Sequence, residues 1–129
     1  MIVLGTDFSE DSLLALTLAE QLSDMLSTTV RVVYVNPHAD SALPDSATQW
    51  LQNAGLESSD VVLRTGTPWL ELLRFAEEHD AQMICVAAHG ESGYQAMTTG
   101  TNTRRLLVRS SVPVIVAPAV AKPHPTKPR

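Results

Sequence analysis

The sequence predicts an α/β fold built on a five-stranded parallel sheet with helices on both faces. Short apolar segments rich in β-branched residues alternate with segments in which apolar residues recur at helical spacing. Strands that alternate with helices form right-handed βαβ units, which leave all strands parallel and cover both faces of the sheet. If the chain winds one way through three strands and returns for two more, the strand order is 3-2-1-4-5.

The first predicted elements are a strand, an amphipathic helix and a second strand. Residues 1–4 are apolar and stop at Gly5, which predicts a short buried strand. Ser9 can cap the following helix, because a serine oxygen accepts a hydrogen bond from an N–H group of the first turn. Apolar residues then recur at helical spacing over 13–26. Residues 30–35 are rich in valine, which is typical of a buried strand.

The remaining elements continue the alternation. Thr67 and Pro68 mark a helix start, because proline is favoured at the first helical position, where its missing N–H costs no hydrogen bond. The predicted elements are a short helix over 46–54, a strand over 61–63, a helix from 68 to about 79, a strand over 83–87, a helix from about 101 to 109, and a strand over 112–116.

The charge of the chain argues against a nucleic-acid partner. The 129 residues include 14 acidic and nine basic side chains, for a net charge of −5. Three of the basic residues lie in the last eight positions, so the rest of the chain has a balance of −8. Because nucleic-acid affinity comes largely from neutralising phosphates with Lys and Arg, we expect no such partner.

Length and composition predict one domain over residues 1–118 and a tail over 119–129. The apolar fraction of 44% is enough for a core. The tail is rich in proline and lacks periodicity, so we expect it to be disordered. No apolar run approaches the ~20 residues that span a bilayer, and no basic signal-peptide region opens the chain. We expect a cytoplasmic protein with no membrane partner.

The single cysteine, Cys85, lies in an apolar run. A lone thiol cannot form an internal disulfide, and buried apolar cysteines are normally unreactive. We therefore expect Cys85 to be a core side chain rather than a nucleophile.

The segment from Ala87 to Thr103 contains the candidate ligand site. It leaves a strand and enters a helix, and its glycines at 90 and 100 let backbone N–H groups approach an anion. Polar side chains at 101–103 would lie at a helix N-terminus, which favours anions. The chain has no lysine before Lys122, so this is not a P-loop, and no GxGxxG follows the first strand. The residues alone leave open a phosphate site or a simple glycine turn.

The predicted topology brings this segment beside the first loop of the chain. Ligands of open parallel sheets bind beyond the carboxyl ends of the strands, where the winding direction reverses. In the predicted order this point lies between the first and fourth strands. The loop that contains Asp7 and the loop over 87–93 would then face one crevice.

The order of these motifs resembles the universal stress protein family, over about residues 1–118. The resemblance is carried by Val3-Leu4-Gly5-Thr6-Asp7-Phe8-Ser9, Val32-Val33-Tyr34-Val35, Gly66-Thr67-Pro68, His89-Gly90 with nine residues to Gly100-Thr101, and Val112-Pro113-Val114-Ile115-Val116. Its most specific part is the last loop, which in ATP-binding members reads Gly, two residues, Gly, nine residues, Gly, then Ser or Thr. In this chain Ala87 stands in place of the first glycine.

The resemblance implies a Rossmann-like fold of the adenine-nucleotide α-hydrolase type that binds ATP, with or without Mg²⁺, at the C-terminal edge of the sheet. It makes Asp7 the acid that faces the adenosine, and Val35 the residue whose main chain meets the adenine. Gly90, Gly100, Thr101, Asn102 and Thr103 would hold the phosphates. The full implied set is Gly5, Thr6, Asp7, Val35, Ala87, His89, Gly90, Gly100, Thr101, Asn102 and Thr103, with no catalytic or metal-ligating residue.

Three functions stay open at this point. The first is a non-enzymatic regulatory protein of the stress response that binds an adenine nucleotide and acts on a protein partner. The second is a slow ATP hydrolase, for which His89 and Glu91 are the only loop candidates as base and metal ligand. The third is an interaction module whose pocket is closed by Ala87.

All three functions are compatible with a homodimer. The predicted strand over Val112–Val116 would be an apolar edge of the sheet, and an unprotected edge invites pairing with another copy. The family resemblance also implies antiparallel pairing of this strand in a two-fold dimer.

Overall fold

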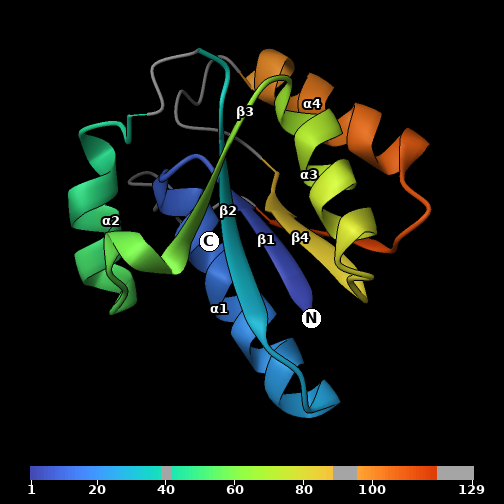
Figure 1. The fold of residues 1–129 in the computed structure, drawn as a ribbon, viewed down its shortest axis with the longest axis horizontal. Helices are drawn as coiled ribbons and strands as arrows, with labels where there is room; N and C mark the ends of the chain where they lie inside the picture. The colour runs from blue at the N-terminus through green and yellow to red at the C-terminus, as the bar shows by residue number, and fades with distance from the viewer. Residues whose placement is uncertain (39–41, 89–95, 119–129) are drawn as a thin grey trace, which may run out of the picture.

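The computed structural model describes residues 1–38, 42–88 and 96–118. Their elements follow in the order β1 (Ile2–Thr6), α1 (Glu10–Leu26), β2 (Val30–Asn36), α2 (Ser46–Ala54), the 3-10 turn η1 (Ser58–Asp60), β3 (Val61–Thr65), α3 (Pro68–Glu78), β4 (Met83–Ala87), α4 (Ala96–Arg109) and β5 (Val114–Ala117) (Figure 1). The predicted tail over 119–129 lies outside the described residues.

The five strands form one parallel sheet in the order β3-β2-β1-β4-β5, which confirms the predicted fold class and strand order. Strand β1 lies between β2 and β4, at the centre of the sheet (Figure 1). The chain winds outward from β1 to β3 and then returns to β4 and β5. The carboxyl ends of β1 and β4 are therefore the point where the winding direction reverses, which is where such sheets bind ligands.

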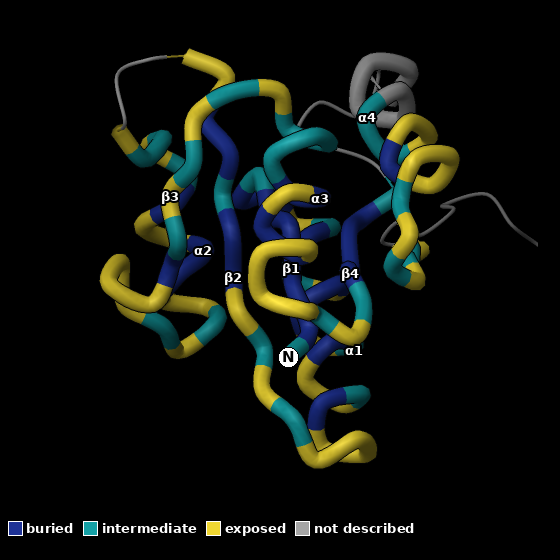
Figure 2. The backbone as a smooth tube through the Cα atoms, turned by 45° about the vertical axis from the view of Figure 1, so that its right-hand side comes forward, coloured by how far each residue is buried: buried dark blue, intermediate teal, exposed yellow. Residues whose placement is uncertain are grey.

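The sheet separates two hydrophobic cores. Helices α1 and α2 cover one face and helices α3 and α4 cover the other. Successive side chains of a strand point to opposite faces, so Ile2 and Leu4 pack in the core under α1 and α2, whereas Val3 packs in the core under α3 and α4. All of β1 is buried, as the dark blue central strand in Figure 2 shows.

Both predicted helix starts are confirmed, and so is the buried cysteine. The Ser9 side chain accepts a hydrogen bond from the N–H of Ser12 at the start of α1, and Pro68 opens α3. Cys85 is 1% exposed within β4. Burial raises the pKa of its thiol to about 11, so the unreactive protonated form dominates at neutral pH.

Two element boundaries differ from the prediction. Helix α4 begins at Ala96, about five residues early, because nothing before Gly100 stops a helix and an interior glycine costs only about 1 kcal/mol. The packing of Leu106, which is 1% exposed, holds the helix against the sheet. Strand β5 begins at Val114 rather than at position 112, because the Ser110 hydroxyl bonds both the N–H and the C=O of Val112 in a turn.

Among the helices that the structure describes, none combines the length and the hydropathy that crossing a membrane requires.

Candidate functional site

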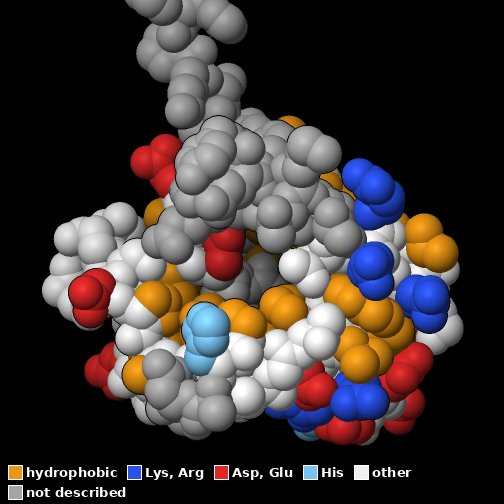
Figure 3. All heavy atoms as spheres, turned by 90° about the horizontal axis from the view of Figure 1, so that it is seen from above, with side chains coloured by type: hydrophobic (Ala, Val, Ile, Leu, Met, Phe, Trp, Pro, Cys, Tyr) orange, Lys and Arg blue, Asp and Glu red, His pale blue; other side chains and the backbone are white. Residues whose placement is uncertain are grey.

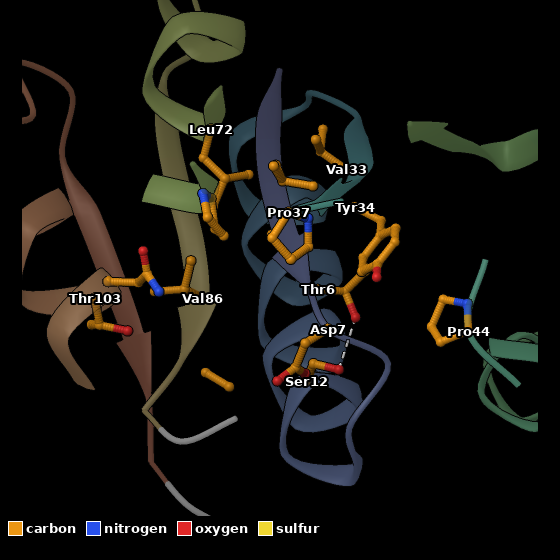
Figure 4. A pocket seen from close by; sticks show the side chains of 15 residues that line it. Thr6, Asp7, Ser12, Val33, Tyr34, Pro37, Pro44, Leu72, Val86 and Thr103 are labelled. Atoms are coloured by element: carbon orange, nitrogen blue, oxygen red, sulfur yellow. Dashed lines mark hydrogen bonds between the residues drawn. The ribbon is translucent and has the colours of Figure 1, made fainter. Parts of the chain in front are cut away.

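A cavity of about 300 Å³ opens at the carboxyl ends of the central strands. Its described lining comes from the ends of β1, β2 and β4, the loops that follow β1 and β2, and the helices α1, α3 and α4. These residues are Gly5, Thr6, Asp7, Ser12, Val33, Tyr34, Val35, Pro37, Pro44, Pro68, Leu72, Val86, Ala87, Asn102 and Thr103 (Figure 4). The cavity lies at the point where the winding direction reverses.

Hydrogen bonds within the loop from β1 to α1 give the cavity one rigid polar wall. Thr6 Oγ1 accepts from the N–H of Phe8 at 2.8 Å and donates to Ser12 Oγ at 2.9 Å, the dashed line in Figure 4. Ser12 Oγ in turn donates to the carbonyl of Ser9 at 2.7 Å. Because both hydroxyls form hydrogen bonds within the protein, Thr6 and Ser12 fix the shape of this wall.

Asp7 is the one charged side chain of the described lining. One carboxylate oxygen, Oδ1, accepts a hydrogen bond from the N–H of Ser9 at 3.0 Å, which orients the side chain. No Lys or Arg among the described residues forms an ion pair with Asp7. The second oxygen, Oδ2, therefore remains available to a donor such as a ribose hydroxyl or an exocyclic amine.

The opposite part of the cavity is apolar. Val33 and Val35 of β2, Leu72 of α3 and Val86 of β4 line it. In Figure 4 Leu72 and Val33 lie at the other end of the cavity from Asp7 and Ser12. A cavity with one apolar end and a few polar groups suits a ligand that has a flat apolar part and a hydroxylated part.

Phe8 connects the cavity to helix α2 through an aromatic cluster. Its backbone has φ 62, in the left-handed region, where a bulky side chain costs on the order of 1–3 kcal/mol. The centroid of its ring lies 5.0 Å from the ring centroid of Tyr34, which lines the cavity, and 5.3 Å from that of Trp50. Phe8 is only 3% exposed, so burial of the ring against two aromatic neighbours offsets the backbone strain.

Seven predicted site residues come together around the cavity. Gly5, Thr6, Asp7, Val35, Ala87, Asn102 and Thr103 all line it. His89 and Gly90 lie outside the described residues. Gly100 and Thr101 belong to the backbone of α4, and the side chain of Thr101 is outside the description.

The early start of α4 corrects one part of the predicted phosphate site. A helix leaves only its first four N–H groups without a partner inside the helix. Because α4 begins at Ala96, the N–H groups of 101–103 lie in its second turn rather than at its N-terminus. Asn102 and Thr103 therefore face the cavity with their side chains, while their N–H groups serve the helix.

Ala87 lines the cavity without closing it. The residue is 9% exposed at the end of β4, and its backbone does not have a positive φ. Alanine therefore fits at this position without backbone strain, and the cavity of about 300 Å³ remains beside its methyl group.

Several lining residues were not predicted from the sequence, among them Tyr34, Leu72 and the three prolines at 37, 44 and 68. Tyr34 and Pro37 could have been found, because they flank the end of the second strand beside Val35. Leu72 gave no signal, since its helical spacing indicates only a core position.

The arginine side chains that the structure describes on this face of the molecule lie away from the cavity. Figure 3 shows a hollow bordered by hydrophobic side chains, with the visible Lys and Arg side chains gathered to one side. That side carries α3 and α4 in Figure 1.

The chain is similar to solved structures of low sequence identity. It matches the hypothetical protein MJ0577 with a TM-score of 0.73 and 21% identity, covering 94% of this chain and 97% of that one. It matches a universal stress protein in complex with cAMP with a TM-score of 0.65 and 20% identity, covering 92% and 97%. It matches the universal stress protein from Archaeoglobus fulgidus in complex with dAMP with a TM-score of 0.61 and 18% identity, covering 90% and 95%. These likenesses show a shared fold.

A search among curated proteins found no match. A family model described as the universal stress protein family matches residues 1–118, which include every described element of the fold. On this match, the chain belongs to the universal stress protein family.

Proposed function

We propose that this chain is a regulatory protein that binds an adenine nucleotide in the cavity at the C-terminal edge of the sheet. The main support is that residues from three separate segments, predicted as a nucleotide site, border one cavity. They are Gly5 to Asp7 after β1, Val35 at the end of β2, and Ala87 with Asn102 and Thr103 beyond β4. The two similar structures in complex with cAMP and dAMP support an adenine nucleotide as the ligand.

The lining suggests how each part of the nucleotide would be held. The apolar end formed by Val33, Val35 and Leu72 suits the flat base. Asp7, with Oδ1 fixed by Ser9, suits the ribose hydroxyls. Asn102 and Thr103 offer neutral donors to a phosphate. The loop pattern predicts ATP, with or without Mg²⁺, as the nucleotide.

We propose a binding role rather than an enzymatic one. The described lining has one carboxylate, Asp7, and no His, Lys or Arg, whereas hydrolysis needs a placed base and groups that stabilise the leaving phosphate. The alternative of a slow ATP hydrolase rests on His89 and Glu91, which lie outside the described residues. The alternative of a closed pocket has less support, because Ala87 leaves the cavity open.

Calorimetric titration with adenine nucleotides tests the proposal. The key variant is Asp7→Asn, because Asn keeps an oxygen that can accept the Ser9 N–H while it removes the charge. We expect binding to weaken by about tenfold to a hundredfold, as for the loss of a charge-assisted hydrogen bond worth about 1.5–3 kcal/mol. The matched control is Glu10→Ala, which removes an acid of the neighbouring first turn of α1 outside the described lining.

The outcomes separate the candidate functions. Saturable binding that Asp7→Asn weakens and Glu10→Ala preserves supports the proposal. A flat titration of the folded, nucleotide-free protein overturns it in favour of an interaction module. Release of phosphate on prolonged incubation with ATP and Mg²⁺ would establish the hydrolase instead.

We also propose that the protein self-associates through β5. This strand is an edge of the sheet, and Val114, Ile115 and Val116 are only partly buried in the single chain. Leu107 and Val108 of α4, the helix that precedes β5 in the chain, are 49% and 74% exposed. An apolar edge strand favours pairing with a second copy, and exposed apolar side chains favour association.

A further inference from the structure

Phe8 lies between Asp7, which faces the cavity, and Ser9, which caps helix α1. Asp7 lines the cavity, whereas Phe8 is 3% exposed and belongs to the core under α1 and α2. Ser9 accepts a hydrogen bond from the N–H of Ser12 at the start of the helix. Three successive residues therefore serve the cavity, the core and the helix start.

The left-handed backbone of Phe8 makes this arrangement possible. Phe8 has φ 62. Its N–H donates to Thr6 Oγ1 at 2.8 Å, and the next N–H, that of Ser9, donates to Asp7 Oδ1 at 3.0 Å. Because φ sets the angle between the two peptide groups that flank Phe8, a rotation to negative φ would turn Asp7 relative to Ser9. The hydrogen bond that orients the carboxylate would then be lost.

Phenylalanine does not favour this conformation by itself. At positive φ the Cβ atom of an L-residue crowds the backbone, so bulky side chains are rare there. Glycine, which has no Cβ atom, adopts the same φ without strain. The turn at Phe8 therefore needs contacts elsewhere in the fold to hold it.

The ring of Phe8 provides these contacts. It is tilted by 45° against the ring of Tyr34, with the centroids 5.0 Å apart, and meets the ring of Trp50 edge to face, with the centroids 5.3 Å apart. Such geometries are favourable for aromatic pairs. Tyr34 is the partner of Thr6 in the pairing of β2 with β1, and Trp50 is 2% exposed in α2. A rotation of the Phe8 backbone would withdraw the ring from both neighbours.

We propose that Phe8 is a positioning residue of the nucleotide site. Its ring, held between Tyr34 and Trp50, fixes the left-handed turn that aims the Asp7 carboxylate into the cavity. This inference rests on the proposed function. It makes nucleotide affinity depend on Phe8, a side chain outside the described lining of the cavity.

Two substitutions of Phe8 separate this role from simple filling of the core. Phe8→Ala and Phe8→Gly both remove the ring, but glycine alone adopts φ 62 without strain. We expect Phe8→Ala to weaken the binding of adenine nucleotides by about tenfold, because the backbone can relax to negative φ and misplace the carboxylate. Phe8→Gly should bind within about threefold of the parent protein. Calorimetric titration measures both affinities, and circular dichroism checks that each variant is folded.

A double-mutant cycle with Asp7→Ala tests whether Phe8 acts through Asp7. If it does, Phe8→Ala should weaken binding by no more than about twofold in the Asp7→Ala background, since the carboxylate is already absent. An effect as large there as in the parent protein would mean that Phe8 acts on the cavity by another route. That result would overturn the inference.

Leu16→Ala is the matched control for lost core packing. Leu16 is 4% exposed in α1, belongs to the same core as Phe8 and lies outside the described lining. The substitution should lower the free energy of unfolding but leave nucleotide affinity within about twofold of the parent protein. A tenfold loss of affinity in this variant would show that any damage to this core weakens binding, which overturns a specific role for Phe8.

The outcomes keep the inference apart from the function on which it rests. If the parent protein binds nucleotide and Phe8→Ala and Phe8→Gly bind equally well, the positioning role is overturned and the site stays. Failure of the parent protein to bind any adenine nucleotide overturns the proposed function. If either variant does not fold, Phe8→Leu, which keeps an apolar side chain in the core, is compared with the parent protein. We expect it to bind about threefold more weakly, and an unchanged affinity overturns the inference.

Discussion

Leu72 of α3 lies so close to Gly5 of β1 that a Cβ atom added to Gly5 would be 2.6 Å from Leu72 Cδ1. The same atom would be 3.3 Å from Val86 Cγ1. Gly5, Leu72 and Val86 all line the cavity, so this contact closes the cavity floor where the central strand meets α3. Glycine at this position leaves room for the close approach of the Leu72 side chain, which would have to shift to admit a Cβ atom.

Gly5→Ala should therefore destabilise the protein. The added methyl group must displace Leu72, and overpacking of a well-packed core typically costs about 1–3 kcal/mol. Urea denaturation measures the change in the free energy of unfolding. The matched background is Leu72→Ala, in which Gly5→Ala should cost much less, because the two closest atoms, Leu72 Cδ1 and Cδ2, are absent. Equal costs in both backgrounds would show that Leu72 is not the obstacle.

The sequence predicts Gly5 as a site residue but not for this reason. Its place after an apolar run indicates the end of a strand, and the structure confirms that strand. This prediction needs only the neighbouring residues in the sequence. The contact with Leu72 depends on how α3 packs over the sheet, and no local pattern contains that information. The strand order was predictable for the opposite reason, because periodicity and the handedness of βαβ connections restrict the topology strongly.

The start of α4 shows a second limit of prediction. Gly100 and the polar residues after it are typical of a turn before a capped helix, so the sequence favours a helix start near Thr101. In the structure the helix already includes Ala96 to Thr99, because packing of its later turns compensates for the cost of a glycine in its interior. A ligand site predicted from the free N–H groups of a helix start therefore depends on where that helix begins, and the sequence determines this boundary poorly.

The ion pair between Arg64 and Glu78 makes stability depend on pH in a definite direction. The hydrogen bond from Arg64 lowers the pKa of the Glu78 carboxyl from its ordinary value of 4.5. The resulting stabilisation is fully present above the unfolded pKa and is lost as the pH falls below about 4.5 through the lowered folded value. Glu78→Gln should therefore lose less stability than the parent protein between pH 5 and pH 3, measured by urea denaturation.

Glu20→Gln is the control for this measurement, because Glu20 is an exposed acid of α1 that forms no ion pair among the described residues. Its pH profile should follow that of the parent protein. Since Glu78 is exposed, the difference should be small and should decrease at high salt. Identical profiles for Glu78→Gln and the parent protein at low salt would contradict the prediction.

Val114→Pro should convert a dimer into a folded monomer. The carbonyls of Pro113 and Ala117 accept from the N–H groups of Ile84 and Ala88, so alternate residues of β5 face β4. The N–H of Val114 therefore faces the open edge, and its loss costs no hydrogen bond within the sheet. Size-exclusion chromatography with light scattering measures the mass, and thermal unfolding checks the fold.

Val114→Thr is the matched control, because it keeps the N–H and the β-branched shape of the side chain. We expect it to remain largely dimeric. A folded Val114→Pro protein with the mass of a dimer would rule out pairing through this edge. A monomeric parent protein would rule out the self-association itself.

The two cores on opposite faces of the sheet consist of different residues. The changes in the free energy of unfolding caused by one substitution in each core should therefore add, with little interaction between them. The cavity is an exception to this independence. Its wall includes Tyr34 and Ala87 from the side of α1 and α2, and Val35 and Leu72 from the side of α3. A molecule that fills it would touch both layers at once and would couple two halves that otherwise respond to mutation separately.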